Sequence, residues 1–169
     1  MADRNGNGLT PRQQAEMDSE WSPDTDGILR RSAARVILFD PEGRIFLIRG
    51  HDVGDLEHTW WFTVGGGIDS SENPRDGACR ELLEETGYKS EELINLINYY
   101  QDQGCSKAKI YSFLALNCEK IKEQSLDKDE YVKYFECSFD EAVELVESGY
   151  ISDANSILTI ELSKKYIKR

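Results

Sequence analysis

Short apolar runs separated by turn-forming residues mark the first two thirds of the chain. The segment "ARVILFDPEGRIFLIRG", residues 34–50, holds two β-type runs on either side of the turn Asp40-Pro41-Glu42-Gly43. Turn residues between two apolar runs predict a β-hairpin. Further strands are predicted for "WWFTV", "LINLINYY", "KIYSFLALNC" and "YVKYFEC", which are residues 60–64, 93–100, 109–118 and 131–137.

Helix signals follow the first group of strands. Asn73 suits a helix N-cap, Pro74 suits the first helical position and Gly87 suits a left-handed C-terminal stop. These positions predict a helix over residues 74–86, in which Gly87 serves only as the cap.

Two more helices are predicted near the end of the chain. Ser138 and Glu141 have the spacing of a capping box, and Gly149 ends the helix that they begin. The last helix begins near Asp153, and its predicted apolar face consists of Ala154, Ile157, Leu158 and Leu162. Strands mixed with helices in this order predict an α/β sandwich.

Length and polarity predict one folded domain. A chain of 169 residues is long enough for a single hydrophobic core. Residues 1–27 are polar and contain "NGNG" and "SPDTDG", so we expect a flexible N-terminal arm. Residues 28–169 are then expected to form the domain.

Charge and cysteine content limit the partners. The net charge of -12 repels nucleic acid at long range, so no nucleic-acid partner is expected. No apolar run approaches the roughly 18 residues of a membrane span, and no signal-peptide core is visible. The four cysteines form no CxxC pair. We therefore expect a cytoplasmic protein with reduced thiols, without a zinc site, a disulfide or a membrane partner.

The stretch "CRELLEETGY", residues 79–88, gathers acidic residues on the first predicted helix. Glu81 precedes Glu84 and Glu85 by three and four positions, so all three share one helix face. Each like-charged pair costs roughly 0.2–0.5 kcal/mol unless a cation lies between the carboxylates. Magnesium prefers oxygen ligands, and bound divalent cations can neutralise a diphosphate and activate water. These glutamates are candidate metal ligands and catalytic residues; chance clustering in an acidic chain is the alternative.

The spacing around this cluster resembles a known signature. The segment contains Gly66, five residues, Glu72, seven residues, Arg80-Glu81-Leu82, one residue, Glu84-Glu85, one residue, and Gly87-Tyr88. This pattern resembles the Nudix box of the Nudix hydrolases. All its Gly, Glu and Arg positions are filled, and only Tyr88 stands where the pattern usually has an aliphatic residue.

The resemblance implies a fold and a reaction. The implied fold is the Nudix α/β/α sandwich with a mixed β-sheet, over about residues 30–167. The implied reaction is hydrolysis of a nucleoside diphosphate linked to another moiety, with magnesium or manganese as the cofactor. The resemblance adds the carbonyl of Gly65 to the metal ligands. Glu72 is expected to pair with Arg80 and to assist the metal, while Gly66, Arg80 and Gly87 support the structure.

Residues outside the box bear on the substrate, a small nucleotide. Residues 125–162 resemble ADP-ribose pyrophosphatases and related nucleotide-sugar hydrolases, in which a loop glutamate takes part in catalysis. Glu130 is the matching position, with Asp127 and Asp129 as alternatives and a solvated loop charge as the plain interpretation. Trp61 and Tyr100 are candidates for stacking a base, although such aromatic residues more often belong to the core.

Other functions remain open at this level. The first half of the chain resembles Nudix enzymes that hydrolyse nucleoside triphosphates. Processing of RNA 5′ ends, or a binding module without catalysis, are further alternatives. Many related enzymes dimerise, so a homodimer is expected.

The basic residues are segregated by type. Every one up to residue 80 is Arg, nine in all, and every one from 89 to 168 is Lys, ten in all. Packing does not sort the two types by halves, since they exchange freely on surfaces. One hypothesis is a hybrid of two Nudix sources joined near the acidic helix, by design or recombination. The alternative is biased drift in one protein.

Overall fold

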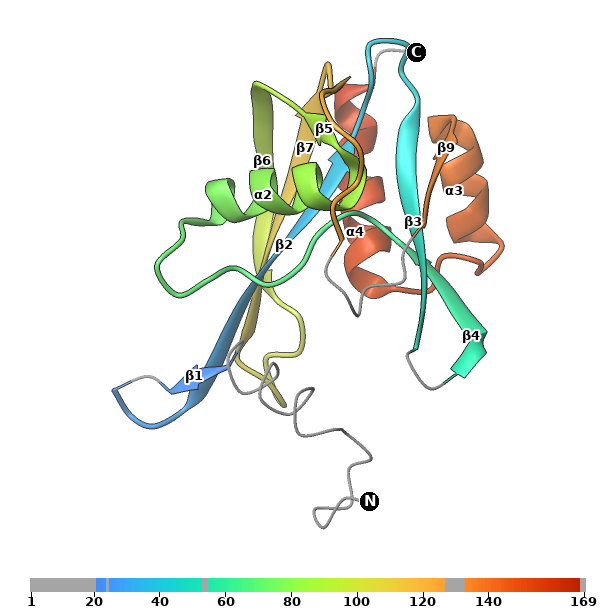
Figure 1. Ribbon diagram of the computed structural model, residues 1–169. Helices are drawn as coiled ribbons and strands as arrows, with labels where there is room; N and C mark the ends of the chain where they lie inside the picture. Colours follow the sequence, from blue (N-terminus) through green and yellow to red (C-terminus); the bar gives the residue numbers. More distant parts are fainter. Residues whose placement is uncertain (1–20, 24, 53–54, 127–132, 168–169) are drawn as a thin grey trace.

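A group of strands, one helix, a second group of strands and a final group of helices follow one another along the chain (Figure 1). The computed structural model describes residues 21–23, 25–52, 55–126 and 133–167. The strands are β1 (Ser22–Pro23), β2 (Leu29–Leu38), β3 (Ile45–Asp52), β4 (Asp55–Phe62), β5 (Tyr88–Lys89), β6 (Glu92–Tyr100), β7 (Ala108–Leu116), β8 (Glu119–Lys120) and β9 (Lys133–Cys137). The helices are α2 (Pro74–Thr86), α3 (Phe139–Glu147), α4 (Ala154–Ser163) and the short 3-10 helix η1 (Lys164–Tyr166).

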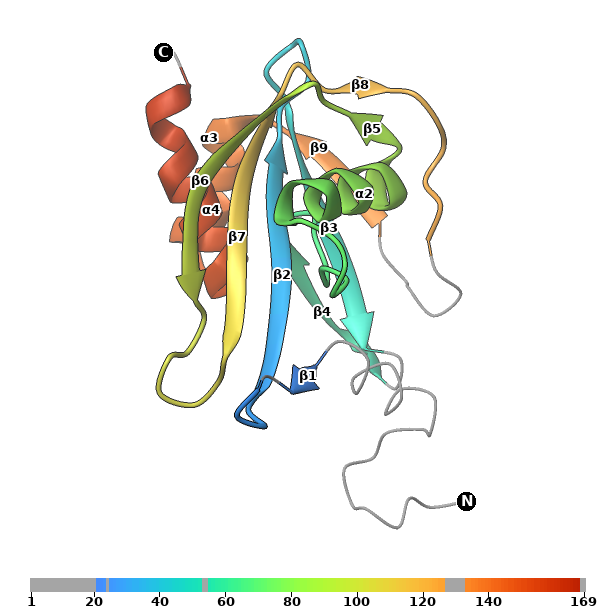
Figure 2. The same cartoon turned by 90° about the vertical axis from the view of Figure 1, so that its left-hand side faces the viewer.

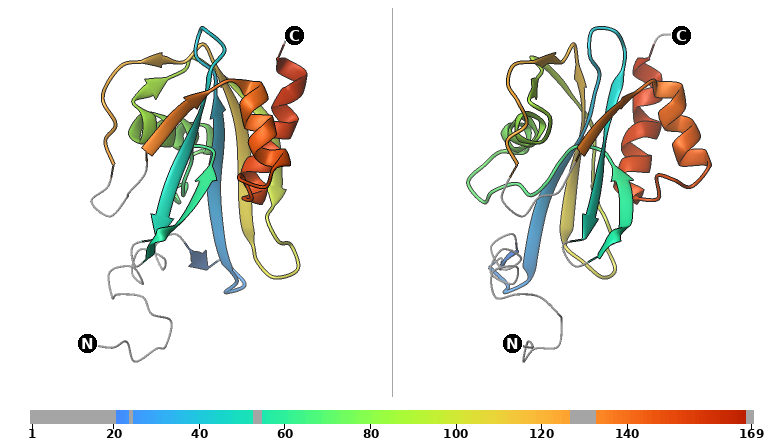
Figure 3. Two further views of the ribbon diagram at one scale, coloured as in Figure 1. Left: turned by 90° about the vertical axis from the view of Figure 1, so that its right-hand side faces the viewer. Right: turned by 45° about the vertical axis from the view of Figure 1, so that its right-hand side comes forward.

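The strands form two main sheets between helical layers. One sheet has the order β1-β2-β7-β6 and is mixed, because β2 and β7 run parallel while the other neighbours are antiparallel. The second sheet has the antiparallel order β4-β3-β9. α2 lies on one side of the sheets, and α3 and α4 lie on the other (Figures 2 and 3). The predicted α/β/α sandwich with a mixed sheet is confirmed.

Both strands of the predicted hairpin over residues 34–50 are present, but they pair with each other only next to the turn. Asp40 and Gly43 close the turn through backbone hydrogen bonds, and a single bridge joins Phe39 to Ile45. Beyond this bridge β2 pairs with β7, and β3 pairs with β4 and β9. The strands separate because β2 is buried on both faces, which suits a central position with neighbours on either side.

The signals at the ends of α2 are confirmed. The helix covers Pro74–Thr86, and the side chain of Asn73 accepts hydrogen bonds from the amides of Arg75 and Asp76. Gly87 follows the helix with a φ of 77°, a left-handed conformation that glycine adopts without strain. The helix that carries the acidic cluster is therefore specified by its local sequence.

The predicted apolar face of α4 is only partly correct, because Ile157 alone of its four residues packs against the buried core. Ala154 is exposed, and Ile157, Leu158 and Leu162 are only half-buried. The helix instead turns a largely polar face to the sheet, formed by Asn155, Ser156, Thr159, Ile160 and Ser163. Ser156 Oγ accepts a hydrogen bond from the Thr63 amide at 2.8 Å, and Thr159 Oγ1 lies 2.8 Å from Ser112 Oγ. The hydroxyl groups of Ser156 and Thr159 can be buried because partners in other elements satisfy them.

The predicted N-terminal arm is described only at its end. Residues 22 and 23 form β1 and pair with residues 29 and 30 of β2. Residues 1–20 lie outside the described residues, so the arm stays a prediction. Among the helices that the structure describes, none is long and apolar enough to cross a membrane.

Candidate active site

α2 presents the acidic cluster to the glycine-rich segment that follows β4. Glu81 and Glu85 are 8% and 5% exposed, whereas the side chain of Glu84 is 44% exposed. The three predicted ligands thus belong to one end of one helix, but two of them are buried against the segment at residues 65–67. Carboxylates are seldom buried unless they have polar or charged partners. The partners of these glutamates therefore determine what the site can bind.

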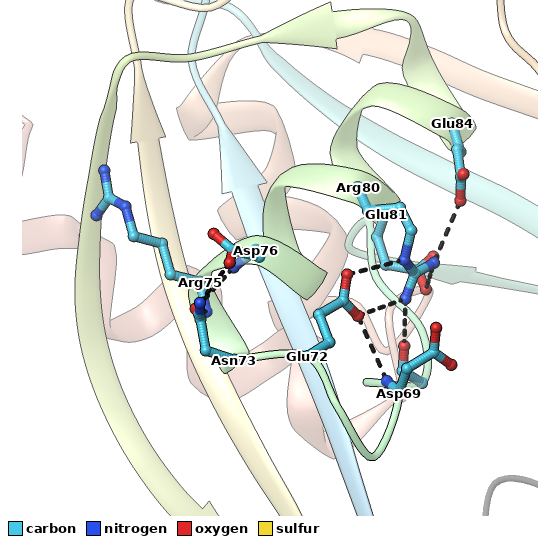
Figure 4. A network of polar contacts seen from close by, with 9 residues as sticks. Asp69, Glu72, Asn73, Arg75, Asp76, Arg80, Glu81 and Glu84 are labelled. Atoms are coloured by element: carbon cyan, nitrogen blue, oxygen red, sulfur yellow. Dashed lines mark hydrogen bonds and ion pairs between the residues drawn. The ribbon is translucent and has the colours of Figure 1, made fainter.

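Arg80 lies among the glutamates (Figure 4). Its Nη1 is 2.9 Å from Glu81 Oε1 and 3.2 Å from Glu84 Oε2. Its Nη2 is 3.1 Å from Glu72 Oε2 and donates to the Gly67 carbonyl at 2.8 Å. The predicted pairing of Glu72 with Arg80 is present. The hydrogen bond to Glu72 and the nearby Glu81 raise the pKa of Arg80, and the Arg80 guanidinium in turn holds the pKa of Glu72 below its ordinary value.

Two glycines allow the carboxylates to come close to the backbone. The Gly65 amide donates to Glu85 Oε2 at 2.7 Å. A Cβ on Gly65 would lie 2.2 Å from the Ala34 carbonyl oxygen, and the φ of 141° also favours glycine. A Cβ on Gly66 would lie 2.6 Å from Glu81 Oε1. Gly65 therefore cannot carry a side chain without a shift of the backbone, while a side chain at Gly66 would displace the Glu81 carboxylate.

The donor set suits a hard divalent cation, although the donors have other partners here. Among the described residues, no three acidic, histidine or cysteine side chains converge as a ready metal site. Glu81 and Glu84 contact Arg80, and Glu85 holds the Gly65 amide. Magnesium takes carboxylate oxygens as ligands in proteins, so the chemistry of these side chains fits such an ion once their oxygens leave Arg80 and the Gly65 amide.

The Gly65 carbonyl has a partner that sequence reasoning missed. Nη1 of Arg35, on β2, donates to this oxygen at 2.5 Å. The carbonyl that the resemblance assigns to the metal thus faces a guanidinium. The only sequence signal was an arginine within the apolar run "ARVIL".

Gly87 does more than cap α2, which corrects its predicted role. Its carbonyl accepts hydrogen bonds from the amides of Ile121 and Lys122, at 2.9 and 3.2 Å. The Ser125 amide donates to the Glu84 carbonyl at 2.8 Å. The segment that leads to Glu130 is therefore attached to the C-terminal end of the acidic helix. Glu130 itself lies outside the described residues, as do Asp127 and Asp129.

The two aromatic candidates lie apart from the glutamates. Trp61 packs edge-on against Phe135, with ring centroids 4.8 Å apart, and the Arg49 guanidinium lies 5.8 Å from its ring centroid. Tyr100 is 39% exposed at the end of β6. Within the described residues, no ring contact or hydrogen bond joins either side chain to the acidic cluster. Their role in stacking a base stays a prediction.

Comparison with known proteins decides the family. Residues 29–158 match the family described as NUDIX domain. The chain belongs to the Nudix family. It is 32% identical to the ADP-ribose pyrophosphatase of Bacillus subtilis (strain 168) over 130 residues, which are 76% of this chain and 70% of that protein. It is 40% identical to the RNA pyrophosphohydrolase of Bartonella quintana (strain Toulouse) over 80 residues, 42% of this chain and 46% of that protein.

A solved Nudix-like structure supports the architecture. The crystal structure of an ADP compounds hydrolase has a TM-score of 0.70 with this fold at 20% identity, and the match covers 86% of this chain and 82% of that chain. The match with the Bacillus subtilis protein spans 76% of this Nudix chain, so it includes residues on both sides of the arginine–lysine boundary. A chain of single origin is expected to match one relative in both its arginine-containing and its lysine-containing part. The hybrid hypothesis therefore has no support other than the separation of Arg from Lys along the sequence.

Proposed function

We propose that this Nudix protein is a divalent-metal-dependent hydrolase that cleaves the diphosphate of ADP-ribose or a related nucleotide sugar. The observation that carries the proposal is the burial of Glu81 and Glu85 against Gly66 and Gly65, with Glu84 beside them. The 32% identity to an ADP-ribose pyrophosphatase supports the choice of substrate.

Each residue of the site has a separate task in this proposal. Glu81, Glu84 and Glu85, with the Gly65 carbonyl, would hold magnesium or manganese. When bound, such a cation neutralises the diphosphate and lowers the pKa of a water molecule. Arg80 and Glu72 keep the residue 65–72 segment against α2 through their ion pair. Release of Glu81 and Glu84 from Arg80 would free their oxygens for the cation.

We propose Glu130 as the base that removes a proton from the attacking water. The hydrogen bond between the Ser125 amide and the Glu84 carbonyl supports this role, because it attaches the chain to α2 five residues before Glu130. Asp127 and Asp129 are the alternatives in the same loop. Glu130→Gln should lower kcat by about 100-fold or more if it is the base, since general-base catalysis contributes typically 10²–10⁴-fold. Asp127→Asn and Asp129→Asn are the matched controls.

The deciding experiment is an assay of purified protein with magnesium and ADP-ribose that follows the formation of AMP. GDP-mannose, a deoxynucleoside triphosphate and 5′-triphosphorylated RNA are tested in parallel. AMP formation with little triphosphate cleavage supports the proposal, whereas triphosphate cleavage alone contradicts the substrate class. RNA is the second candidate because of the 40% local identity, but the net charge of -12 opposes RNA binding.

Glu81→Gln and Glu84→Gln separate an enzyme from a binding module. Both variants should keep the fold and lose turnover and magnesium affinity if the protein is an enzyme. A binding module would keep its affinity for ADP-ribose in both variants and would show no turnover in the wild type.

The assembly and the compartment are also proposals. We propose a homodimer, which light scattering of the purified protein tests. We propose a cytoplasmic location, supported by the free thiols of Cys79, Cys105, Cys118 and Cys137. Fractionation of the producing cells tests the location.

A further inference from the structure

Arg35 places a positive charge beside the glycine-rich segment, on a strand that the Nudix box does not include. Its Nη1 is 2.5 Å from the Gly65 carbonyl oxygen and 3.4 Å from that of Ala34. The side chain is partly buried. Both partners are neutral backbone oxygens, so the hydrogen bonds hold the guanidinium in position without balancing its charge.

The charge of Arg35 has no carboxylate partner within the described part of the chain. Arg44 and Arg80 make ion pairs with glutamate or aspartate, but Arg35 takes part in none. The Nε of Arg35 is buried and hydrogen-bonds to no described residue. A partly buried cation with unused donors is unfavourable unless an anion completes its contacts. This arrangement points to an anionic ligand.

Gly65 links this guanidinium to the acidic cluster. The amide of Gly65 binds Glu85 on α2, while its carbonyl binds Arg35 on β2. The carboxylates and the guanidinium are therefore separated by one backbone residue. A phosphate group on the carboxylate side would need a metal ion, but a neighbouring phosphate could contact Arg35 directly. Carboxylates that could hold a metal ion on one side of Gly65, and a guanidinium on the other, match the charges of a diphosphate with a metal ion bound to one of its phosphates.

We propose that Arg35 binds the diphosphate of the substrate, next to the metal site that the glutamates form. The planar guanidinium can bind a phosphate through two parallel hydrogen bonds. In the absence of an anion, the Gly65 carbonyl keeps the side chain in place. A cation bound to that carbonyl would repel Nη1 and favour its transfer to a phosphate oxygen. The inference rests on the proposed function for the identity of the substrate, but not for diphosphate binding itself.

The test compares Arg35→Met and Arg35→Lys with Arg75→Met. Arg75 is a matched control because its Nη1 also donates to a backbone carbonyl, that of Leu93 at 2.7 Å, and it points away from Arg80 and the glutamates (Figure 4). ADP is titrated calorimetrically in the presence of magnesium. ADP-ribose kinetics, thermal unfolding and Mn²⁺ binding followed by electron paramagnetic resonance are measured on the same proteins.

Loss of one charge-assisted contact should weaken ADP binding about 10- to 100-fold in Arg35→Met. We expect a similar increase in KM for ADP-ribose, a smaller change in kcat, and partial recovery in Arg35→Lys. Mn²⁺ affinity should be unchanged or higher, because the variant removes a cation from the Gly65 carbonyl. Arg75→Met should bind ADP like the wild type.

Three results with the variants would overturn the inference: unchanged ADP affinity in Arg35→Met, an equal loss of ADP affinity in Arg75→Met, or a parallel loss of Mn²⁺ affinity in Arg35→Met, which would indicate that Arg35 supports the metal site. A wild type that binds no ADP would overturn it as well. If ADP binding depends on Arg35 but ADP-ribose is not hydrolysed, the proposed function fails and the diphosphate-binding role stands.

Discussion

Nη2 of Arg80 lies 3.1 Å from Oε2 of Glu72, and the side chain of Glu72 is only 17% exposed. This ion pair joins the loop before α2 to the middle of the helix. It also lowers the pKa of Glu72, mainly through the hydrogen bond from the guanidinium. A carboxylate whose pKa is depressed in the folded state adds stability above its unfolded pKa, about 4.3 for Glu. That stability is lost as the pH falls through the folded pKa.

Arg80→Met should therefore destabilise the protein in a pH-dependent way. At pH 7 we expect a loss of about 1–3 kcal/mol in the free energy of unfolding, because a partly buried carboxylate loses its partner. At pH 3.5 the loss should be smaller, since Glu72 is largely protonated in the unfolded chain, where its pKa is about 4.3, and its contribution to stability falls below that pH. Urea denaturation at the two pH values measures the difference. An equal loss at both would show that packing of the Arg80 stem, and not its charge, is responsible.

Magnesium should stabilise Arg80→Met more than it stabilises the wild type. Without the guanidinium, Glu72, Glu81 and Glu84 repel one another, and a cation can replace the missing charge. A ligand that binds only the folded state raises stability by RT ln(1 + [L]/Kd), so a tighter site gives a larger shift in Tm. Thermal unfolding with increasing magnesium checks this, with sodium at equal ionic strength as the control. A smaller shift in the variant would mean that Arg80 positions the ligands.

Gly65→Ala and Gly66→Ala should affect different properties, the first stability and the second metal binding. At Gly65 the added Cβ would meet the backbone carbonyl of Ala34, so we expect a loss of about 2–4 kcal/mol in stability. At Gly66 it would meet the end of the Glu81 side chain, which can move. Gly66→Ala should remain folded but bind Mn²⁺ about 10- to 100-fold more weakly. Urea denaturation and Mn²⁺ titration separate the two effects. Normal Mn²⁺ affinity in Gly66→Ala would contradict the prediction and show that the Glu81 carboxylate can move without weakening the metal site.

Gly87→Ala and Gly149→Ala form a matched pair. Both glycines have a positive φ, 77° and 79°, so each substitution costs about 1–2 kcal/mol in backbone strain. Only at Gly87 would the Cβ also approach a neighbour, the Lys122 carbonyl oxygen at 2.0 Å. Gly87→Ala should therefore be less stable by a further 1–3 kcal/mol, roughly the cost of overpacking, and should lose activity as the 121–125 segment moves. Equal stability and activity in both variants would argue against this attachment.

Local signals predicted the acidic helix well, while pairing between distant segments could not be predicted. The ends of α2 depend on Asn73, Pro74 and Gly87, which act within a few residues of themselves. The turn at Asp40 was equally local. Whether β2 pairs with β3 to form a hairpin depends on β7, which lies about 70 residues later in the chain. In the structure β2 pairs with β7, which suits a strand that is buried on both faces.

The inner face of α4 shows the limit of hydrophobic periodicity. Leu158 and Leu162 were predicted to lie on a buried apolar face, yet they are only half-buried, while Ser156 and Thr159 are fully buried. Their burial depends on hydrogen bonds with Thr63 and Ser112. These residues lie far from α4 in the sequence, so the pattern within the helix cannot predict the contacts. In the candidate site, spacing identified the glutamates, but it could not identify Arg35, since the Gly65 carbonyl is brought to it only by the folded sheet.

The two hydrogen bonds of Gly65 have a practical consequence for spectroscopy. Its amide proton is held by Glu85, and its carbonyl accepts from Arg35. In a ¹⁵N-labelled sample the Gly65 cross-peak should shift when a cation draws charge from the Glu85 carboxylate. Withdrawal of Arg35 from the carbonyl polarises the next peptide less and should move the Gly66 cross-peak. Two adjacent glycine signals would thus report separately, in one NMR experiment, on the Glu85 carboxylate and on the carbonyl that Arg35 holds.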